Sequence, residues 1–452
     1  MSESAVVDWL FEQVIKKMKP TYTMGDMENA LSSISKEVCR MALTRATQQV
    51  ASEQSFECNQ CECELNVKHK HRKRKVESSY GQIVFSRAYG LCPRCLNYCY
   101  PADLALGLQE RAPASPRVQE ICALTTLRAP AGQAESDVRR LTGLNICGST
   151  LHREARRQGE RAIQLRDADE LLTQTPQGVA ELASRADVHE NPFTLIIEID
   201  AWNIRERDNW GQTKKLKNCG EDTKRWHWVY TGTVFRLDQR SQNISGRPII
   251  SERGYVATRR GIEGFQRQIY AEALQRGLLK AENILILADG AVWIWNIADD
   301  RFKGAQQRVD LYHVKEHLWE LAGELFGRGT EEAEKWVRPF LNWLKKRNNG
   351  ALDVINSLQE IDPGKYTEKQ QQVLNREINY FTGHKDRMDY KKGKSAGQPI
   401  GSGAIESTCA QYQRRFKLTG QFWSLEGDEA FLALDTLHRN NRWHQLFPHD
   451  LQ

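Results

Sequence analysis

The order of predicted strands and helices between residues 192 and 312 constrains the fold of this chain most strongly. Runs of apolar or alternating residues predict five strands, and a stretch with helical spacing separates the third strand from the fourth. The predicted strands cover residues 193–201, 225–237, 249–258, 283–288 and 307–312. Helices are expected at 262–279 and from about Ala291 onward. Because polar, glycine-containing loops join the first three strands, we expect an antiparallel meander within a mixed α/β domain.

Two of these strands end in an aspartate. Asp200 closes the apolar run that begins at Leu195, and Asp289 closes the run that begins at Ile284. A buried acid at a strand end is unfavourable unless the protein uses it, although a turn or a helix cap would also explain each aspartate. Glu406 lies just inside a predicted helix entered through a glycine-rich turn, where the helix dipole favours a carboxylate. Together the three acids predict a Mg²⁺ site, because this ion prefers oxygen ligands and two ions roughly 4 Å apart need carboxylates from several elements.

The cysteines predict a second kind of metal site. Seven of the eleven cysteines lie in the first hundred residues, and four of those form the pairs Cys58-x2-Cys61 and Cys92-x2-Cys95. Each pair can place two thiolates on one tetrahedral ion, so the four residues predict a structural Zn²⁺ in a zinc-ribbon-like module. The alternatives are a permuted ligand set or buried thiols that bind no metal. The nearby residues that could replace one of the four ligands are Cys63, His69, His71 and Cys99.

The densest basic run of the chain lies between the two cysteine pairs, at residues 68–75. Such a run is typical of a patch that contacts phosphates, and it makes Arg72, Lys73 and Arg74 candidate DNA contacts. A solvated strand or loop without a partner is the alternative.

A pair of predicted helices forms a second candidate DNA-binding element. The helices cover 133–141 and 149–161, and a break at 142–145 separates them. This spacing is typical of a helix-turn-helix motif, and Ser149-Thr150 would supply a capping hydroxyl for the second helix. A structural helix pair with a charged outer face is the alternative. The cations of the second helix that are candidate phosphate or base contacts are Arg153, Arg156, Arg157 and Arg161.

Charge and hydropathy exclude an apolar membrane-spanning segment. The net charge is +6, charged residues make up 27% of the chain, and no apolar run approaches the roughly 20 residues that cross a bilayer. The first ten residues carry Glu3 and Asp8 where a signal peptide would carry basic residues. We therefore expect a cytoplasmic protein.

Several short stretches, found in order along most of the chain, carry a family resemblance. They are residues 92–95 (CPRC), 101–108 (PADLALGL), 288–291 (ADGA), 310–313 (DLYH), 387–390 (RMDY) and 400–406 (IGSGAIE). With them, the sequence resembles the insertion-sequence DDE transposases of the ISKra group and, more distantly, Mutator-type enzymes. The resemblance implies an RNase H-like catalytic domain, which the predicted element order also favours. It further implies that Asp200, Asp289 and Glu406 bind two Mg²⁺ ions, with Mn²⁺ as an alternative.

The function implied by this resemblance is that of a DNA transposase. Such an enzyme binds double-stranded DNA at the terminal repeats of an insertion sequence, cuts it, and joins the freed 3′ ends to target DNA. Because two ends must be joined together, we expect a homodimer or a higher oligomer, associated with a bacterial nucleoid. The alternatives are a DNA-binding repressor without catalysis and an RNase H-like nuclease without strand transfer.

Further site residues follow from the resemblance. Asp310-x2-His313 is similar to the Cys-x2-His element that follows the second catalytic acid in Mutator-like enzymes, and it suggests that His313 lies beside the active site. Asp310 is the alternative to Asp289 as the second catalytic acid, and a core histidine is the alternative for His313. The last predicted helix carries three more candidate phosphate contacts, or else a solvated face: Arg414, Arg415 and Lys417.

These motifs divide the chain into five predicted parts. Residues 1–54 form a helical segment, 55–110 the zinc-ribbon-like module, and 111–185 the helix-turn-helix region. Residues 186–313 and 395–452 form the RNase H-like domain, and 314–394 form an all-helical insertion within it.

Overall fold

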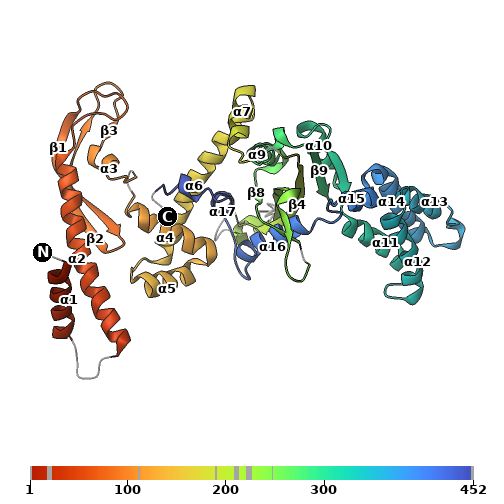
Figure 1. Cartoon of the computed structure of the whole chain (residues 1–452), viewed down its shortest axis with the longest axis horizontal. Helices are drawn as coiled ribbons and strands as arrows, with labels where there is room; N and C mark the ends of the chain where they lie inside the picture. The colour runs from red at the N-terminus through yellow and green to blue at the C-terminus, as the bar shows by residue number, and fades with distance from the viewer. Residues whose placement is uncertain are drawn as a thin grey trace. The chain divides into compact units, whose positions relative to one another are not determined.

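The computed structural model describes residues 3–17, 23–109, 112–188, 191–207, 213–219, 226–246 and 248–448 (Figure 1). The chain divides into two compact units. The first unit consists of Met1–Gln158 with Phe447–Gln452, and the second unit is Gly159–Leu446. Both units mix helices with strands, and helices predominate. Within the described residues, no helix is both long enough and apolar enough to cross a membrane.

The first unit opens with two helices, followed by a small antiparallel sheet. The helices are α1 (Glu3–Lys17) and α2 (Met24–Glu53), and the strands, in sheet order, are β1 (Asn66–Ser78), β2 (Gly81–Leu91) and β3 (Tyr98–Cys99). The basic run 68–75 lies within β1. A tight turn separates β1 from β2, and in it Gly81 has a φ of 103° that side chains rarely tolerate.

Four helices follow this sheet. They are α3 (Pro101–Ala105), α4 (Pro116–Arg128), α5 (Ala131–Thr142) and α6 (Gly148–Leu172), of which α6 continues into the second unit. Gly143 ends α5 in the left-handed conformation, where it closes the helix with a backbone hydrogen bond to Arg139. Buried apolar residues of α4, α5 and the start of α6 share one core, which includes Val118, Val138 and Leu151.

The second unit is built on a five-stranded mixed sheet. Its strands are β4 (Thr194–Arg205), β5 (Trp226–Arg236), β8 (Gly254–Thr258), β9 (Asn283–Ala288) and β10 (Gln306–Val309), and their order in the sheet is β10-β9-β4-β5-β8. The first three form the expected antiparallel meander. β9 pairs in parallel with β4, and β10 in parallel with β9.

Two predicted strands differ from the structure. The strand expected over 249–258 is split into β7 (Pro248–Ile250), which pairs with β6 (Arg240–Gln242), and β8. The strand expected over 307–312 ends at Val309, because Asp310 caps the next helix with its carboxylate, which accepts a hydrogen bond from the backbone N–H of Tyr312. The aspartate at this position therefore ends the strand.

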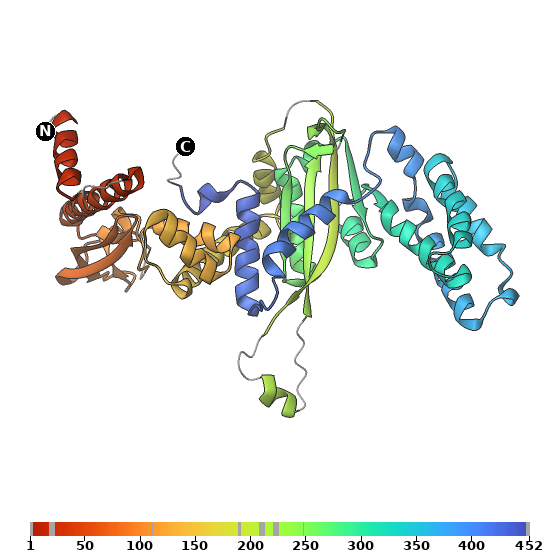
Figure 2. The same cartoon turned by 90° about the horizontal axis from the view of Figure 1, so that it is seen from below.

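Alternation along β4 gives the sheet two different faces. Leu195, Ile197 and Ile199 pack into the main core with α9 (Gly261–Gln275) and α10 (Val292–Arg301). The residues between them face the other way, where Ile196 packs against Ala404 of α16. Figure 2 shows α16 (Gly403–Phe416, blue) crossing this second face of the green sheet.

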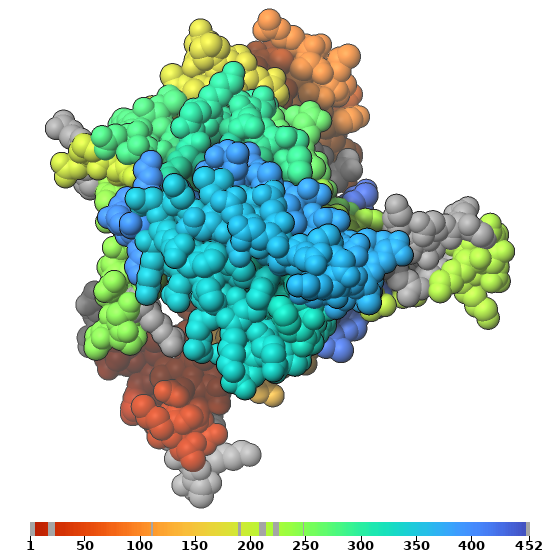
Figure 3. Space-filling view, turned by 90° about the vertical axis from the view of Figure 1, so that its right-hand side faces the viewer, coloured from red at the N-terminus to blue at the C-terminus, as the bar shows by residue number. Residues whose placement is uncertain are grey.

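A group of helices lies between β10 and α16 in the sequence, and Figure 3 looks onto it. It consists of α11 (Leu311–Phe326), α12 (Glu331–Lys346), α13 (Gly350–Gln359), α14 (Glu368–His384) and α15 (Tyr390–Ser395). In the described part of the chain, every regular element from Leu311 to Ser395 is helical. The remaining elements of the second unit are α7 (Pro176–Ser184), α8 (Thr213–Asn218), α17 (Leu425–Arg439) and short 3₁₀ turns at Leu237–Gln239, Leu278–Lys280, Pro363–Lys365, Lys385–Arg387 and Trp443–Gln445.

Candidate functional site

Three aspartates lie side by side where the parallel pairing of β4, β9 and β10 stops. β4 itself continues past Asp200 to Arg205, further than the strand predicted over 193–201. The register pairs Ile199 of β4 with Ala288 of β9, and Ala288 with Val309 of β10. The next residues of these strands are Asp200, Asp289 and Asp310. Because paired residues of parallel strands share a face, all three aspartates belong to the face that α16 covers.

Helix α16 is fastened to this edge of the sheet. The buried carboxylate of Glu198 accepts a hydrogen bond of 2.8 Å from the backbone N–H of Ile405, in the first turn of the helix. About one turn later, the Cys409 thiol lies 3.6 Å from Oδ2 of Asp200. The first turns of α16 therefore lie directly over the middle of β4, at Glu198 and Asp200.

Glu406 reaches the same place through a short chain of polar contacts. Ser402 Oγ donates a 2.7 Å hydrogen bond to Oδ2 of Asp310 and lies 3.4 Å from Oε1 of Glu406. Glu406 itself is exposed, whereas Ser402 and Asp310 are buried. The serine thus joins the turn before α16 to the aspartate at the end of β10.

Asp289 and Asp310 differ in burial and in how many of their carboxylate oxygens already accept a hydrogen bond. Asp310 is completely buried, and its two oxygens accept hydrogen bonds from Tyr312 N–H and Ser402 Oγ. Asp289 is half-buried and accepts one hydrogen bond, from the backbone N–H of Ala291 at 2.9 Å. Asp289 therefore has the more available oxygens, and Asp310 holds its neighbours in position.

The electrostatics of this edge suit a bound cation. Burial raises the pKa of Asp200, and the negative charge of Asp289 raises it further, against the hydrogen bond from Ala201 N–H. Burial also raises the pKa of Glu198 to about 8, which the N–H of Ile405 opposes. Within the described residues, no basic side chain forms an ion pair with any of the predicted triad residues. Ionised carboxylates crowded together without a counterion are stabilised by a cation.

The carboxylate oxygens of the predicted triad do not lie together at the distances of metal ligands. Among the described residues, the cysteine group below is the one set of three or more potential ligands whose atoms all lie within 4.8 Å of one another. Glu406 is an exposed side chain, so a change of rotamer would move its carboxylate at small cost. Carboxylate oxygens are the donors that Mg²⁺ prefers, but in this structure those of the predicted triad do not lie together at ligand distances.

His313 lies close to these acids. It occupies the first turn of α11, directly after the Asp310 cap, and its charge lowers the pKa of Asp200. Its side chain is 38% exposed and its Nδ1 lies 3.1 Å from Glu316. A half-exposed ring is not a core histidine, so His313 belongs to the surface around the carboxylates.

Helix α14 adds residues that the sequence did not single out. Gly290, directly after Asp289, has a φ of 106°, and a Cβ there would lie 3.4 Å from Tyr380 Oη and 3.5 Å from His384 Nε2. Both side chains carry a buried polar atom without a hydrogen-bond partner in the described structure, Tyr380 Oη and His384 Nδ1. His317 stacks on Tyr380 at 3.6 Å. These residues reach the site by tertiary packing alone, so no local sequence signal indicates them.

The segment before α16 is anchored by a buried arginine. Arg308 of β10 is fully buried and donates hydrogen bonds of 2.8–2.9 Å to Asp389, Gln398 Oε1 and the carbonyl of Pro399. Gly393 passes so close that a Cβ would lie 2.5 Å from the guanidinium carbon. The RMDY stretch therefore has a structural role, since its aspartate helps to hold the chain that leads to Glu406.

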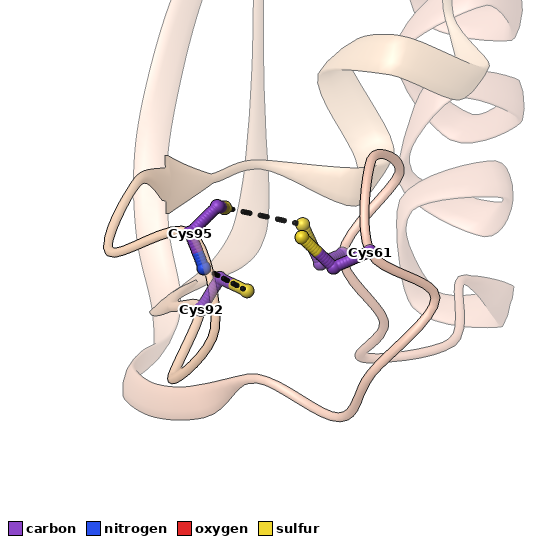
Figure 4. Close-up of side chains that lie close together, drawn as sticks. Cys61, Cys92 and Cys95 are labelled. Carbon is purple, nitrogen blue, oxygen red and sulfur yellow. Dashed lines mark hydrogen bonds between the residues drawn. The ribbon is translucent and has the colours of Figure 1, made fainter.

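The four predicted zinc ligands come together in the first unit. The sulfurs of Cys58, Cys61, Cys92 and Cys95 all lie within 4.8 Å of one another, as the view of three of them in Figure 4 illustrates. The backbone N–H of Cys95 donates to Cys92 Sγ at 3.4 Å, and this contact lowers the pKa of the Cys92 thiol to about 6. Four thiols at this spacing can hold a metal such as zinc.

The other candidate ligands are arranged differently. Cys63 Sγ lies 3.3 Å from Cys92 Sγ, and Cys99 Sγ lies 3.7 Å from Cys58 Sγ, so both border the group. His69 and His71 are exposed on β1, and His69 stacks on Tyr89. The histidines therefore belong to a surface beside the cysteine group.

The basic run on β1 contains one buried member. Arg72 and Lys73 are exposed, but Arg74 is buried in an ion pair with Asp103 and donates to the carbonyls of Gln109 and Ala112. The prediction that Arg74 contacts DNA is therefore wrong. Its position on the inward face of the strand decides this, because alternate residues of β1 point to opposite sides.

The predicted helix pair exists, with a different cap. The N-terminus of α6 is capped by Glu135 of α5, whose Oε2 accepts the N–H of Gly148 at 2.7 Å, so the expected cap by Ser149-Thr150 is wrong. Arg153 is exposed, whereas Arg156 and Arg157 are half-buried, and Arg157 pairs with Glu154 at 3.0 Å. Arg161 donates to the carbonyl of Leu446 at 3.4 Å, within the second unit.

The three predicted cations at the C-terminal end of α16, of which Lys417 directly follows the helix, differ in their exposure. Arg414 and Lys417 are exposed, and Lys417 Nζ lies 5.5 Å from the centre of the Trp202 ring. Arg415 is buried with its guanidinium 5.2 Å from the Trp423 ring centre, and burial lowers its pKa to about 10. The prediction of Arg415 as a phosphate contact is therefore wrong, because its charge is packed against an aromatic ring inside the unit.

Comparisons with known proteins give a distant relative. No family model matches the chain. It is similar to a protein of Streptococcus gallolyticus described as "UPF0236 protein in vanSb 3'region", with 24% identity over 443 residues that cover 95% of this chain and 86% of that protein. A solved structure, "Drosophila P element transposase strand transfer complex", aligns with 76% of this chain and 83% of its own at 12% identity and a TM-score of 0.25. A score this low does not establish a shared fold.

Proposed function

We propose that this chain is a DNA transposase of the DDE class, in which Asp200, Asp289 and Glu406 form one active site. The observation that carries the proposal is the placement of Asp200 and Asp289 directly after the last paired residues of the parallel strands β4 and β9, on the face covered by α16. Glu406 lies in the first turns of that helix. Three acids from two strands and a late helix suit the binding of two Mg²⁺ ions.

The sheet topology supports an RNase H-like catalytic domain. An antiparallel meander is followed by two parallel strands that add to the other side of its first strand. This is the element order of RNase H-like enzymes, in which the first strand, the fourth strand and a late helix supply the acids. β4, β9 and α16 are those three elements here.

In this proposal the surrounding residues keep the acids in place. Glu198 holds the first turn of α16 against β4, and Asp310 with Ser402 fixes the turn that leads to Glu406. When bound, two Mg²⁺ ions would lower the pKa of a water molecule and neutralise charge on the scissile phosphate. His313, whose charge acts on Asp200, would contact the DNA backbone or the acids.

The reaction conserves phosphodiester bonds after the first cut. Water attacks phosphorus at the end of the element, one P–O bond breaks, and the element's 3′-hydroxyl is released. That hydroxyl then attacks a phosphate of target DNA, and the target's own 3′-oxygen leaves with the proton. One bond forms as one breaks, so the joining step needs no energy-supplying cofactor.

The first unit supplies the surfaces that we assign to DNA recognition. Arg72 and Lys73 on β1 and Arg153 on α6 are exposed cations that can contact phosphates of double-stranded DNA. The cysteine group would hold Zn²⁺ as a structural ion near β1. Since two element ends are joined in one reaction, we infer that the active species is a homodimer or a higher oligomer.

The test is a cleavage and strand-transfer assay with the purified chain and Mg²⁺. The substrates are DNA ends taken from the sequences that flank the gene, and the same ends with shuffled sequence. We expect cutting and joining of the native ends only. Cutting without joining or end preference would identify a nuclease instead, and binding without cutting would identify a repressor. Mn²⁺ binding, measured by electron paramagnetic resonance, gives a readout that is independent of activity.

A further inference from the structure

An open cavity of about 1430 Å³ lies on the first unit, beside the cysteine group. Its walls combine cationic side chains of β1 with three tyrosines, Tyr89 of β2 and Tyr98 and Tyr100 from either side of Cys99. We call it the tyrosine cavity. The predicted phosphate contacts Arg72 and Lys73 also line it, but nothing in their assignment accounts for the aromatic rings.

The rings of the tyrosine cavity form a supported stack. Arg87 is buried in an ion pair with Asp103 and lies 4.4 Å below the Tyr100 ring centre. Tyr100 stacks on Tyr89 at 5.1 Å, and Tyr98 leans on Tyr89 at 5.9 Å with an interplanar angle of 54°. A fixed cation at the base and ring contacts above it restrict the motion of these side chains, so the surface is preorganised.

The outer member of the stack is accessible. Tyr98 is 61% exposed, although a large aromatic ring is usually more buried. Arg72 lies over the Tyr89 ring at 5.0 Å and within 3.5 Å of Tyr100 Oη, so a cation borders the rings. Lys73 and Lys75 add positive charge at the wall, and the acids Glu57 and Glu62 line the side nearest the cysteine group.

Cations interleaved with exposed rings indicate a particular ligand. In duplex DNA the faces of the bases are stacked and hidden, so a protein surface meets the phosphates, the sugars and the base edges in the grooves. Unpaired nucleotides offer both a flat face for stacking and a phosphate for a cation. We propose that the tyrosine cavity binds unpaired nucleotides of single-stranded DNA, with a base stacked on Tyr98 and phosphates on Arg72 and Lys73. That the single strand is DNA rests on the proposed function. That the cavity binds unpaired nucleotides rests on its rings and cations alone.

The cysteine group positions this surface. The N–H of Cys92 donates to the carbonyl of Asn97 at 2.9 Å, and Tyr98 follows directly and pairs with Leu91 in the sheet. The loop that carries two of the thiols therefore also carries Tyr98. A metal held by the cysteine group would keep the ring in place, which couples zinc content to binding of single strands.

The experiment measures binding by the zinc-loaded full chain without Mg²⁺, so that no DNA is cut. Three fluorescein-labelled probes are used: a short single-stranded DNA, the same strand with abasic sites in place of its bases, and the duplex. Tyr98→Ala should weaken binding of the single strand by about tenfold, because one stacked base is lost. It should change duplex and abasic binding by less than about twofold.

The matched control is Tyr80→Ala. Tyr80 is 44% exposed at the turn between β1 and β2 and does not line the cavity, so this variant should bind all three probes like wild type. Zinc content verifies that each variant is folded. Equal loss for single-stranded and abasic probes, or an unchanged single-strand affinity in Tyr98→Ala, would overturn the proposal. These results hold whether or not the chain joins DNA ends, since catalysis is not measured.

Discussion

Replacement of the buried Arg308 should destabilise the second unit and displace the segment that leads to Glu406. The guanidinium is fully buried and makes three hydrogen bonds, to Asp389, to Gln398 and to the carbonyl of Pro399. Arg308→Met keeps most of the aliphatic volume but leaves these acceptors without a donor. Breaking a buried ion pair in this way costs about 3 to 5 kcal/mol. Because Asp389 is 27% exposed, we expect the lower end, about 3 kcal/mol.

Chemical denaturation followed by tryptophan fluorescence measures this effect selectively. All tryptophans except Trp9 lie within Gly159–Leu446, so the signal reports on the second unit. The matched control is Arg338→Met, since Arg338 is 73% exposed and pairs with Glu334 on the helix surface. That variant should change the free energy of unfolding by less than about 0.5 kcal/mol.

The comparison of the two arginine variants decides whether this reasoning holds. If Arg308→Met unfolds at the same denaturant concentration as Arg338→Met, the buried hydrogen bonds contribute no net stability and the anchoring role is refuted. If it unfolds earlier, Mg²⁺-dependent cleavage should fall as well, because the turn before α16 loses its attachment to β10.

Three further predictions concern other parts of the chain. Burial raises the pKa of Asp428 to about 9, so the folded state keeps a proton that the unfolded state releases, and stability falls as pH rises. Asp428→Asn should remove this loss: relative to wild type it should gain roughly 4 kcal/mol between pH 5 and pH 8, at about 1.4 kcal/mol per unit, and parallel pH profiles would contradict this. Cys92→Ser should lose bound zinc and the hydrogen-exchange protection of β1 to β3, whereas the exposed Cys219→Ser should retain both. Ser402→Ala leaves Oδ2 of Asp310 without a donor, so it should lower the free energy of unfolding by about 1 to 2 kcal/mol and slow cleavage; unchanged values for both would exclude a positioning role.

Local patterns predicted the frame of the candidate site. The apolar runs that end at Asp200 and Asp289 are strands in the structure, and their register follows from a buried sheet with helices on both faces. The paired cysteines likewise come together, because each Cys-x2-Cys turn needs few residues to place two sulfurs. In both cases the information lies within a few consecutive residues.

What the sequence could not predict depends on packing between distant segments. In the sequence, Arg74 and Arg415 cannot be distinguished from the exposed basic residues beside them. Their guanidinium groups are buried because of the way the chain folds. Glu198 lies inside the predicted strand 193–201, where no pattern distinguishes it, yet its carboxylate accepts a hydrogen bond from the first turn of α16, 207 positions away. Tyr380 and His384 lie next to Gly290 because of the way the helical region packs. No local periodicity in the sequence predicts this contact.

The central claim is that Asp200, Asp289 and Glu406 act in one site that cuts and joins DNA. The most direct measurement is Mg²⁺-dependent strand transfer of native element ends by Asp200→Asn, Asp289→Asn and Glu406→Gln, each compared with Asp300→Asn. Asp300 is exposed on α10 and pairs with Arg301, so its variant tests the same chemical change away from the site. The account predicts that the three site variants bind the ends but neither cut nor join them, and that Asp300→Asn does both. Strand transfer by Asp200→Asn or Glu406→Gln at the wild-type rate would contradict it.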